Sequence, residues 1–290
     1  MSEIQYVLSP TASDVGFPVQ RLLPAAQVRA VGPFVFFDHM GPARFARAGT
    51  AGDVRPHPHI GLATVTYLYT GALIHRDSLG SVQRIEPGAI NLMAAGRGIV
   101  HSERVPADIR AGQMPVHGIQ IWLALPAERE EMAPAFHHYP ADALPAVTAA
   151  GVALRVLIGA AFGQVSPVIA YAPTLQVDGE LAAGAGLELP PDGPERGVYL
   201  VDGRLRVAGT LLEPGQLAVL TPGRSVRLEA ETAVRLMVVG GAPLDGRRFL
   251  YWNFVARSRE RIEAAKADWA AGRFAPVPGE TECIPPPWPS

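Results

Sequence analysis

The side chains best suited to chemistry stand in a short proline-bracketed stretch, Arg55-Pro56-His57-Pro58-His59-Ile60-Gly61. Residues two apart project from the same face of an extended strand, so His57 and His59 can bind one metal ion if this stretch is extended. The prolines favour that geometry, because a residue before proline avoids the helical region. Since Pro58 has no N–H to donate, we expect the pair at the start of a strand or on an edge strand. The alternative is a proline-rich turn with two solvated histidines.

A second pair with the same spacing is formed by His101 and Glu103. If this stretch is also extended, the two strands together offer three imidazoles and one carboxylate to one interior. Imidazole suits iron, copper, nickel and zinc, the carboxylate favours iron or manganese, and no thiolate is present to demand zinc. The alternative for Glu103 is a surface ion pair with Arg104 or Arg97.

The elements that must position these residues are predicted to be strands. Short apolar or alternating runs separated by Gly and Pro fill 31–125 and 152–239, a pattern typical of an all-β sandwich or barrel. The expected strands are 31–38, 63–69, 73–77, 90–93, 118–125, 154–158, 198–201, 205–207, 218–220 and 234–239. One helix is expected between Ser258, as its N-cap, and Gly272. The polar, weakly patterned segment 127–145 is the candidate linker.

An internal repeat indicates two related β domains. Glu86-Pro87-Gly88 recurs as Glu213-Pro214-Gly215, and glycines at 96 and 223 share the same offset of 127 residues (86 to 213, 96 to 223). Upstream, 67–71 resembles 199–203 at an offset of 132 residues (67 to 199). Such self-similarity is the signature of a duplicated unit. We therefore predict an N-terminal metal-binding domain over residues 1–135 and a C-terminal domain without metal ligands over residues 136–290.

The second copy carries none of the candidate ligands. At the two offsets, the positions corresponding to His101, Glu103, His57 and His59 are Leu228, Ala230, Leu189 and Pro191. No histidine follows His138. The metal chemistry is therefore expected in the first domain alone, and the second is predicted to be structural, a partner surface or a non-metal pocket.

Composition narrows the class of protein further. With 290 residues, 48% hydrophobic and 18% charged, the chain can bury substantial cores, and its net charge of −2 gives no bulk electrostatic reason to bind nucleic acid or an anionic membrane. Cys283 is the single cysteine, so no intrachain disulfide or cysteine metal cluster is expected. The sequence shows no signal peptide and no apolar run near the ~20 residues of a membrane span. We expect a cytoplasmic protein.

Several runs together closely resemble the pirin family of the cupin superfamily. They are 57–68, 75–80 and 94–103, strengthened by 34–42 and 117–122. The resemblance implies an all-β fold of two tandem cupin (jelly-roll-like) β-barrels with a C-terminal helix. It also implies a metal, usually iron, held in the N-terminal barrel by the residues matching His57, His59, His101 and Glu103. Thr64 stands where the general cupin pattern has a glutamate, and the tail after 244 looks like a bacterial branch.

The same resemblance implies a quercetinase-type oxidoreductase that cleaves the ring of a flavonol such as quercetin with O2. Fe(II) is the expected cofactor, with Ni, Cu, Mn or Zn as alternatives. Glu103 is expected to accept a proton as well as to bind the metal, and His117 and Gln120 to contact substrate. His75 and Trp122 are further pocket candidates that could equally be structural. The alternatives are a non-enzymatic, iron-dependent redox sensor with an unidentified protein partner, and a cupin whose metal is a remnant.

Overall fold

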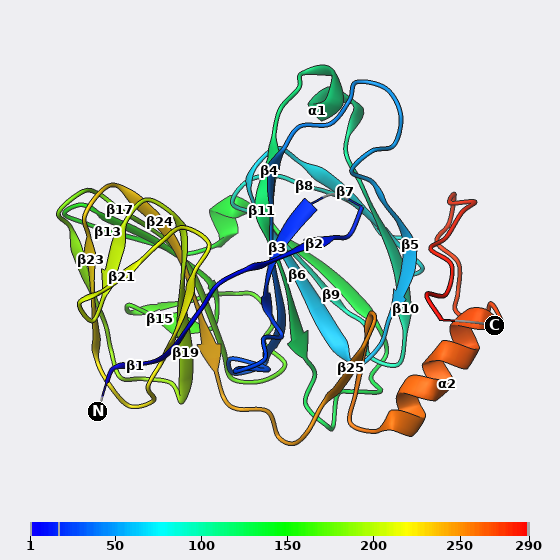
Figure 1. Cartoon of the computed structure of the whole chain (residues 1–290). Coiled ribbons are helices and arrows are strands. Elements are labelled where there is room, and N and C mark those ends of the chain that lie inside the picture. The colour runs from blue at the N-terminus through cyan, green and yellow to red at the C-terminus, as the bar shows by residue number, and fades with distance from the viewer. Residues whose placement is uncertain (1, 17, 289–290) are drawn as a thin grey trace. The chain divides into compact units, whose positions relative to one another are not determined.

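The chain folds into two compact units that are each assembled from several segments (Figure 1). The computed structural model describes residues 2–16 and 18–288. The unit that we call the first barrel comprises Ser13–Val19, His39–Ala141 and Asp245–Ser290. The second barrel comprises Met1–Ala12, Gln20–Asp38 and Asp142–Leu244. No described helix is long and apolar enough to cross a bilayer.

This division differs from the expected single boundary between residues 135 and 136. Strand β1 (Ile4–Leu8) pairs with β22 (Leu217–Leu220), so the N-terminal residues belong with the second barrel. The segment after residue 244 instead belongs with the first barrel. The reason is long-range strand pairing, which composition along the chain does not report.

The first barrel places a four-stranded sheet opposite part of a seven-stranded one, with apolar side chains between them. The four-stranded order is β5 (Val54–His59), β10 (Ile99–Arg104), β7 (Leu73–Asp77) and β8 (Val82–Ile85). The seven-stranded order is β12 (Ala135–Tyr139), β9 (Ile90–Ala94), β6 (Leu62–Thr70), β11 (Val116–Ala124), β4 (Phe34–Ala43), β3 (Pro18–Leu23) and β2 (Thr11–Asp14). Strand β5 is therefore extended and lies at a sheet edge, as the two prolines predict.

The second barrel repeats this plan. Its seven-stranded order is β1, β22, β19 (Glu195–Asp202), β24 (Val234–Gly241), β17 (Thr174–Leu181), β14 (Val152–Ile158) and β13 (Ala146–Ala149). Its four-stranded order is β18 (Gly186–Leu189), β23 (Val226–Ala230), β20 (Leu205–Val207) and β21 (Thr210–Leu212). Two hairpins complete the strands: β15 (Ala160–Ala161) with β16 (Gln164–Val165), and β25 (Phe249–Tyr251) with β26 (Phe254–Ala256). A continuous apolar core lies between the two larger sheets.

The all-β expectation is confirmed, and each of the ten expected strands overlaps an observed one. The expected linker is wrong in part, because β12 lies inside it and pairs with β9. All five residues of β12 are half-buried, so this strand shows no apolar alternation. The described helical segments are α1 (Ala107–Ala111), the short 3-10 turn η1 (Ala141–Ala143) and α2 (Arg259–Ala270).

Helix α2 begins where the sequence predicts. The Ser258 hydroxyl accepts a hydrogen bond from the Arg261 N–H at 3.1 Å, which satisfies one of the free donors of the first turn. Its buried face, Ile262 and Ala265, packs in one cluster with Phe254 and with Ile60, the residue that follows β5. The C-terminal helix thus packs against the end of the strand that carries the first histidine pair.

The internal repeat corresponds to matching hydrogen bonds in the two barrels. In the first barrel the Gly88 N–H donates to the Leu68 carbonyl at 3.0 Å. In the second, the Gly215 N–H donates to the Leu200 carbonyl at 2.8 Å. The two pairs are related by the offsets of 127 and 132 residues found in the sequence. The repeat is therefore structural, and positions in the two barrels can be compared through their internal registers.

Gly61 makes the turn between β5 and β6 and can be only glycine there. Its φ is +67°, and a Cβ on it would lie 2.0 Å from the Val255 carbonyl oxygen. Its N–H donates to the Gly96 carbonyl, and its own carbonyl accepts from the Leu125 N–H. This turn therefore fixes the direction in which the chain leaves His59.

We expect Gly61→Ala to lower the free energy of unfolding by more than about 3 kcal/mol, since left-handed strain and a backbone clash act together. Gly272→Ala is the matched control, with φ +65° and no atom within 4 Å of the added Cβ. The control should cost only about 1 kcal/mol. Urea unfolding of both variants measures the difference, and equal midpoints would contradict the argument.

Candidate metal centre

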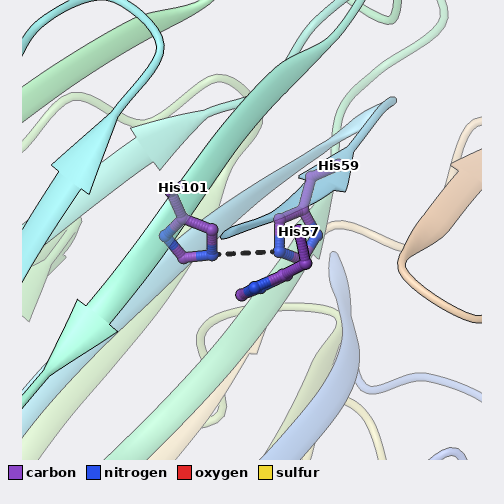
Figure 2. Close-up of side chains that lie close together, drawn as sticks. All are labelled: His57, His59 and His101. Atoms are coloured by element: carbon purple, nitrogen blue, oxygen red, sulfur yellow. Dashed lines mark hydrogen bonds between the residues drawn. The ribbon is translucent and has the colours of Figure 1, made fainter. Parts of the chain in front are cut away.

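Three histidine side chains converge inside the first barrel. His57 and His59 come from β5 and His101 from the neighbouring β10, where His101 pairs directly with His57. One nitrogen from each ring lies within 4.8 Å of the others, and all three residues are buried. Figure 2 shows the rings pointing toward one another, with a dashed line between the Nε2 atoms of His59 and His101. The predicted sharing of one face by residues two apart is thus observed in β5.

The backbone determines which nitrogen of His57 and His59 carries the proton. His57 Nδ1 lies 2.8 Å from the Arg55 carbonyl, and His59 Nδ1 lies 3.2 Å from the Asn253 carbonyl. A carbonyl can only accept, so each Nδ1 must be the protonated, donating atom in the neutral ring. The Nε2 lone pair of both rings is consequently bare and faces the cluster.

A side-chain relay determines the tautomer of His101. The Asp77 carboxylate accepts from His75 Nε2 at 2.9 Å, which leaves Nδ1 of a neutral His75 as an acceptor. His101 Nδ1 lies 3.3 Å from that atom and therefore donates to it. Burial raises the pKa of Asp77, but hydrogen bonds from His75 and Ser81 outweigh it, so the pKa lies below its usual value. The ionised carboxylate thus holds Nε2 of His101 unprotonated.

All three rings are neutral at neutral pH. Burial lowers the pKa of His57 to about 4, against the opposing effect of the Arg55 carbonyl. Burial, reinforced by the neighbouring imidazoles, also places the pKa values of His59 and His101 well below 6.5. Metal binding requires neutral imidazole, so these pKa values suit a metal ligand.

The geometry of the donor atoms fits a metal ion. Nε2 of His59 and Nε2 of His101 are 3.1 Å apart, yet neither carries a proton in the tautomers assigned above. Two nitrogens bound at right angles to one ion at about 2.1 Å lie about 3.0 Å from each other. Buried lone pairs that face each other without a proton are unfavourable unless a cation lies between them. This convergence makes the three histidines a metal-binding candidate.

Glu103, the expected fourth ligand, lies on the same strand as His101 but is not one of the three clustered residues. A register irregularity in the β10–β5 pairing falls between His101 and Glu103. The buried Glu103 carboxylate accepts a hydrogen bond from Gln120 Nε2 at 2.7 Å. The alternative of a surface ion pair with Arg104 is wrong, because Glu103 is buried and Arg104 pairs with Glu280.

Burial raises the pKa of Glu103, and the Gln120 amide and the charge of His75 oppose this only in part. Trp122, from the facing sheet, lies edge-on to the His59 ring with centroids 5.1 Å apart. The structure therefore brings Gln120 and Trp122 to the cluster, Gln120 through Glu103 and Trp122 through His59.

His117 takes a different place from Gln120. Its Nε2 lies 2.7 Å from Nε2 of His39, and its ring contacts Tyr69 with centroids 5.0 Å apart. Burial lowers the pKa of His39 to about 4, and the neighbouring His117 adds to that effect. Strand alternation explains the separation, because a register irregularity follows His117 in the pairing of β11 with β6. A substrate-binding role for His117 stays a prediction.

The second barrel places leucines where the first has histidines. Its β23–β18 register pairs Leu228 with Leu187 and Val226 with Leu189. The first barrel pairs His101 with His57 and Ile99 with His59. The equivalents of His57, His59 and His101 are therefore Leu187, Leu189 and Leu228. The expected equivalents of the first pair, Leu189 and Pro191, lie two residues too far along, because the connection from β18 to β19 is two residues longer.

Sequence analysis missed the roles of His75 and Asp77. The pair has the same spacing of two as the ligand pairs, and both residues are buried on β7. That spacing was the available signal. It could not show that Nδ1 of His75 faces Nδ1 of His101, because this contact depends on the pairing of β7 with β10.

The fold and the histidine cluster define a protein of two cupin barrels, one of which carries a candidate metal site. Two family models match the chain, described as Pirin over residues 16–123 and Pirin C-terminal cupin domain over residues 176–275. The chain therefore belongs to the pirin family, as the sequence motifs predicted.

Individual relatives support this membership. A pirin-like protein of Caulobacter vibrioides is 46% identical over 93% of this chain and 94% of its own length. A Pseudomonas aeruginosa protein provisionally named quercetin 2,3-dioxygenase is 40% identical over 89% of this chain and 80% of its own. A crystal structure of quercetin 2,3-dioxygenase from Acinetobacter baumannii is 34% identical, with a TM-score of 0.90, covering 98% of this chain and 95% of that one.

The relay gives a testable prediction for metal affinity. We expect His75→Phe to weaken metal binding by about 10- to 100-fold, because His101 loses the acceptor that orients it, while the stacking of the ring on Phe136 is preserved. Chelator competition measures the affinity. His137→Phe, a half-buried histidine on β12, serves as control and should bind as the unmodified protein does. Equal affinity of the two variants would show that the relay does not orient His101.

Proposed function

We propose that the protein is a metal-dependent dioxygenase that opens the central ring of a flavonol such as quercetin, with Fe(II) as the cofactor. The observation that carries the proposal is the convergence of three unprotonated Nε2 atoms on one point in the first barrel. Support for the substrate class comes from the names of the relatives in Pseudomonas and Acinetobacter. In this proposal His57, His59, His101 and Glu103 hold the metal, with Glu103 approaching from its bond to Gln120.

The bound metal supplies Lewis-acid activation of the substrate hydroxyl and a meeting place for the two reactants. The residues of the chain do the rest. Asp77 and His75 keep the His101 imidazole in one tautomer and one orientation. The Glu103 carboxylate, whose pKa burial raises, takes the proton of the substrate hydroxyl, and the Gln120 amide keeps it aimed. Both oxygen atoms of O2 enter the ring-opened product, and one ring carbon leaves as carbon monoxide.

The direct test is turnover by protein loaded separately with Fe(II), Ni(II), Cu(II), Mn(II) or Zn(II). Quercetin is added under O2, and loss of flavonol absorbance and release of carbon monoxide are followed together. We expect turnover with at least one metal, and we expect His101→Ala to lose both bound metal and turnover. No turnover with any metal, in protein shown to be loaded, would contradict the enzyme and favour the iron-dependent redox sensor.

A second test isolates Glu103. Glu103→Gln preserves the shape and the contact with Gln120 but removes the proton acceptor, so we expect kcat to fall by at least about 100-fold. The three histidines should still retain metal, which elemental analysis checks in the same sample. Glu188→Gln, on the exposed face of β18, is the control for loss of a carboxylate and should leave kcat unchanged. An unchanged kcat in Glu103→Gln would remove the proton-acceptor role.

A further inference from the structure

The second barrel encloses a cavity of about 220 Å³. It lies at the end of the barrel where β17 and β19 begin and β18 and β24 finish. Its walls are largely apolar and include Phe162, Leu175, Val177, Leu189 and Val238.

Internal registers relate this cavity to the interior beside the histidines of the first barrel. Leu189 is the counterpart of His59, as shown above by the β23–β18 pairing. Arg196 lies four residues before Leu200, as Thr64 lies four before Leu68. The duplicated barrel has thus exchanged a metal ligand for a hydrocarbon and a hydroxyl for a guanidinium.

Arg196 is a buried cation that lines the cavity with a vacant donor. It is 2% exposed and lies on the inner face of β19 together with Val198 and Leu200. Nη1 donates to the Pro190 carbonyl and Nη2 to the Arg224 carbonyl at 2.6 Å. The buried Nε has no hydrogen-bond partner within the described chain.

The guanidinium charge is not neutralised by these contacts. Carbonyl groups satisfy donors but carry no net charge, so burial of the cation remains costly until an anion approaches it. Asp192 lies exposed at the rim and acts only against the lowering of the Arg196 pKa by burial. One free N–H beside a positive charge matches a monoanion, and a phosphate dianion would need more donors than the apolar wall offers.

We propose that this cavity binds a small apolar monocarboxylate, with its carboxylate on Arg196 and its hydrocarbon against the apolar wall. The volume is below the ~300 Å³ at which drug-sized ligand pockets begin, so a single ring or a short branched chain fits. This site does not depend on the chemistry proposed for the histidines.

Benzoate titration of the full-length, metal-loaded protein tests the proposal. Methyl-labelled samples report the two sites separately, because Leu189, Val177 and Val238 line the cavity while the histidines lie in the other barrel. We expect benzoate to shift these methyl signals saturably. Benzyl alcohol and inorganic phosphate, which lack either the charge or the hydrocarbon, should not.

Three variants complete the design. Arg196→Met removes the charge, and Ala242→Phe fills the cavity from a half-buried wall position while leaving Arg196 in place. Each should weaken benzoate binding by at least about tenfold. Arg206→Met removes an exposed arginine paired with Glu231 and should bind benzoate normally. If Arg196→Met does not fold, Ala242→Phe alone decides.

The proposal is overturned by any of four results. These are no saturable shift of the cavity methyls, equal shifts with benzyl alcohol, equal shifts with phosphate, and unchanged benzoate affinity in a folded Arg196→Met or Ala242→Phe protein.

Discussion

Three imidazoles can present bare nitrogens to one point only if every Nδ1 has an acceptor behind it. In this protein two of the acceptors are backbone carbonyls, those of Arg55 and Asn253, and the third is the ring of His75. Asn253 lies between β25 and β26, in the segment after residue 244. The C-terminal segment is therefore part of the metal barrel for a chemical reason, since it supplies the acceptor that orients His59.

The same requirement explains how an edge strand can carry the ligands. Pro56 and Pro58 deprive β5 of two donors, which an edge tolerates but a central strand does not. An unprotected edge invites pairing with other chains. Here the Ile284 N–H donates to the Pro56 carbonyl, Ile60 forms a parallel bridge with Phe254, and α2 packs on both of these apolar residues. The tail thus covers the edge while it positions a histidine.

The sequence predicted the strands and the histidine cluster because both follow from a period of two, which is a local property. It did not predict the composition of each barrel, because the pairing of β1 with β22 joins residues more than two hundred apart. Strand β12 was hidden by its uniform half-burial. The counterparts of His57 and His59 were misplaced because a two-residue insertion among Leu and Pro residues leaves no mark in an apolar pattern. His75 was noticed, but its role needed the register of β7 against β10.

The duplicated barrels show how little sequence change reverses the charge that an interior prefers. In the first, the neutral rings and the relay from Asp77 remove every proton from the inward-facing nitrogens, so the interior presents lone pairs to a cation. In the second, the three equivalent positions are leucines and the inner face of β19 carries Arg196, so the interior presents a positive charge and a free N–H. The backbone registers are alike in both. The preference for a cation or an anion therefore resides in four side chains, and a duplicated barrel that loses its metal ligands need not lose its capacity to bind.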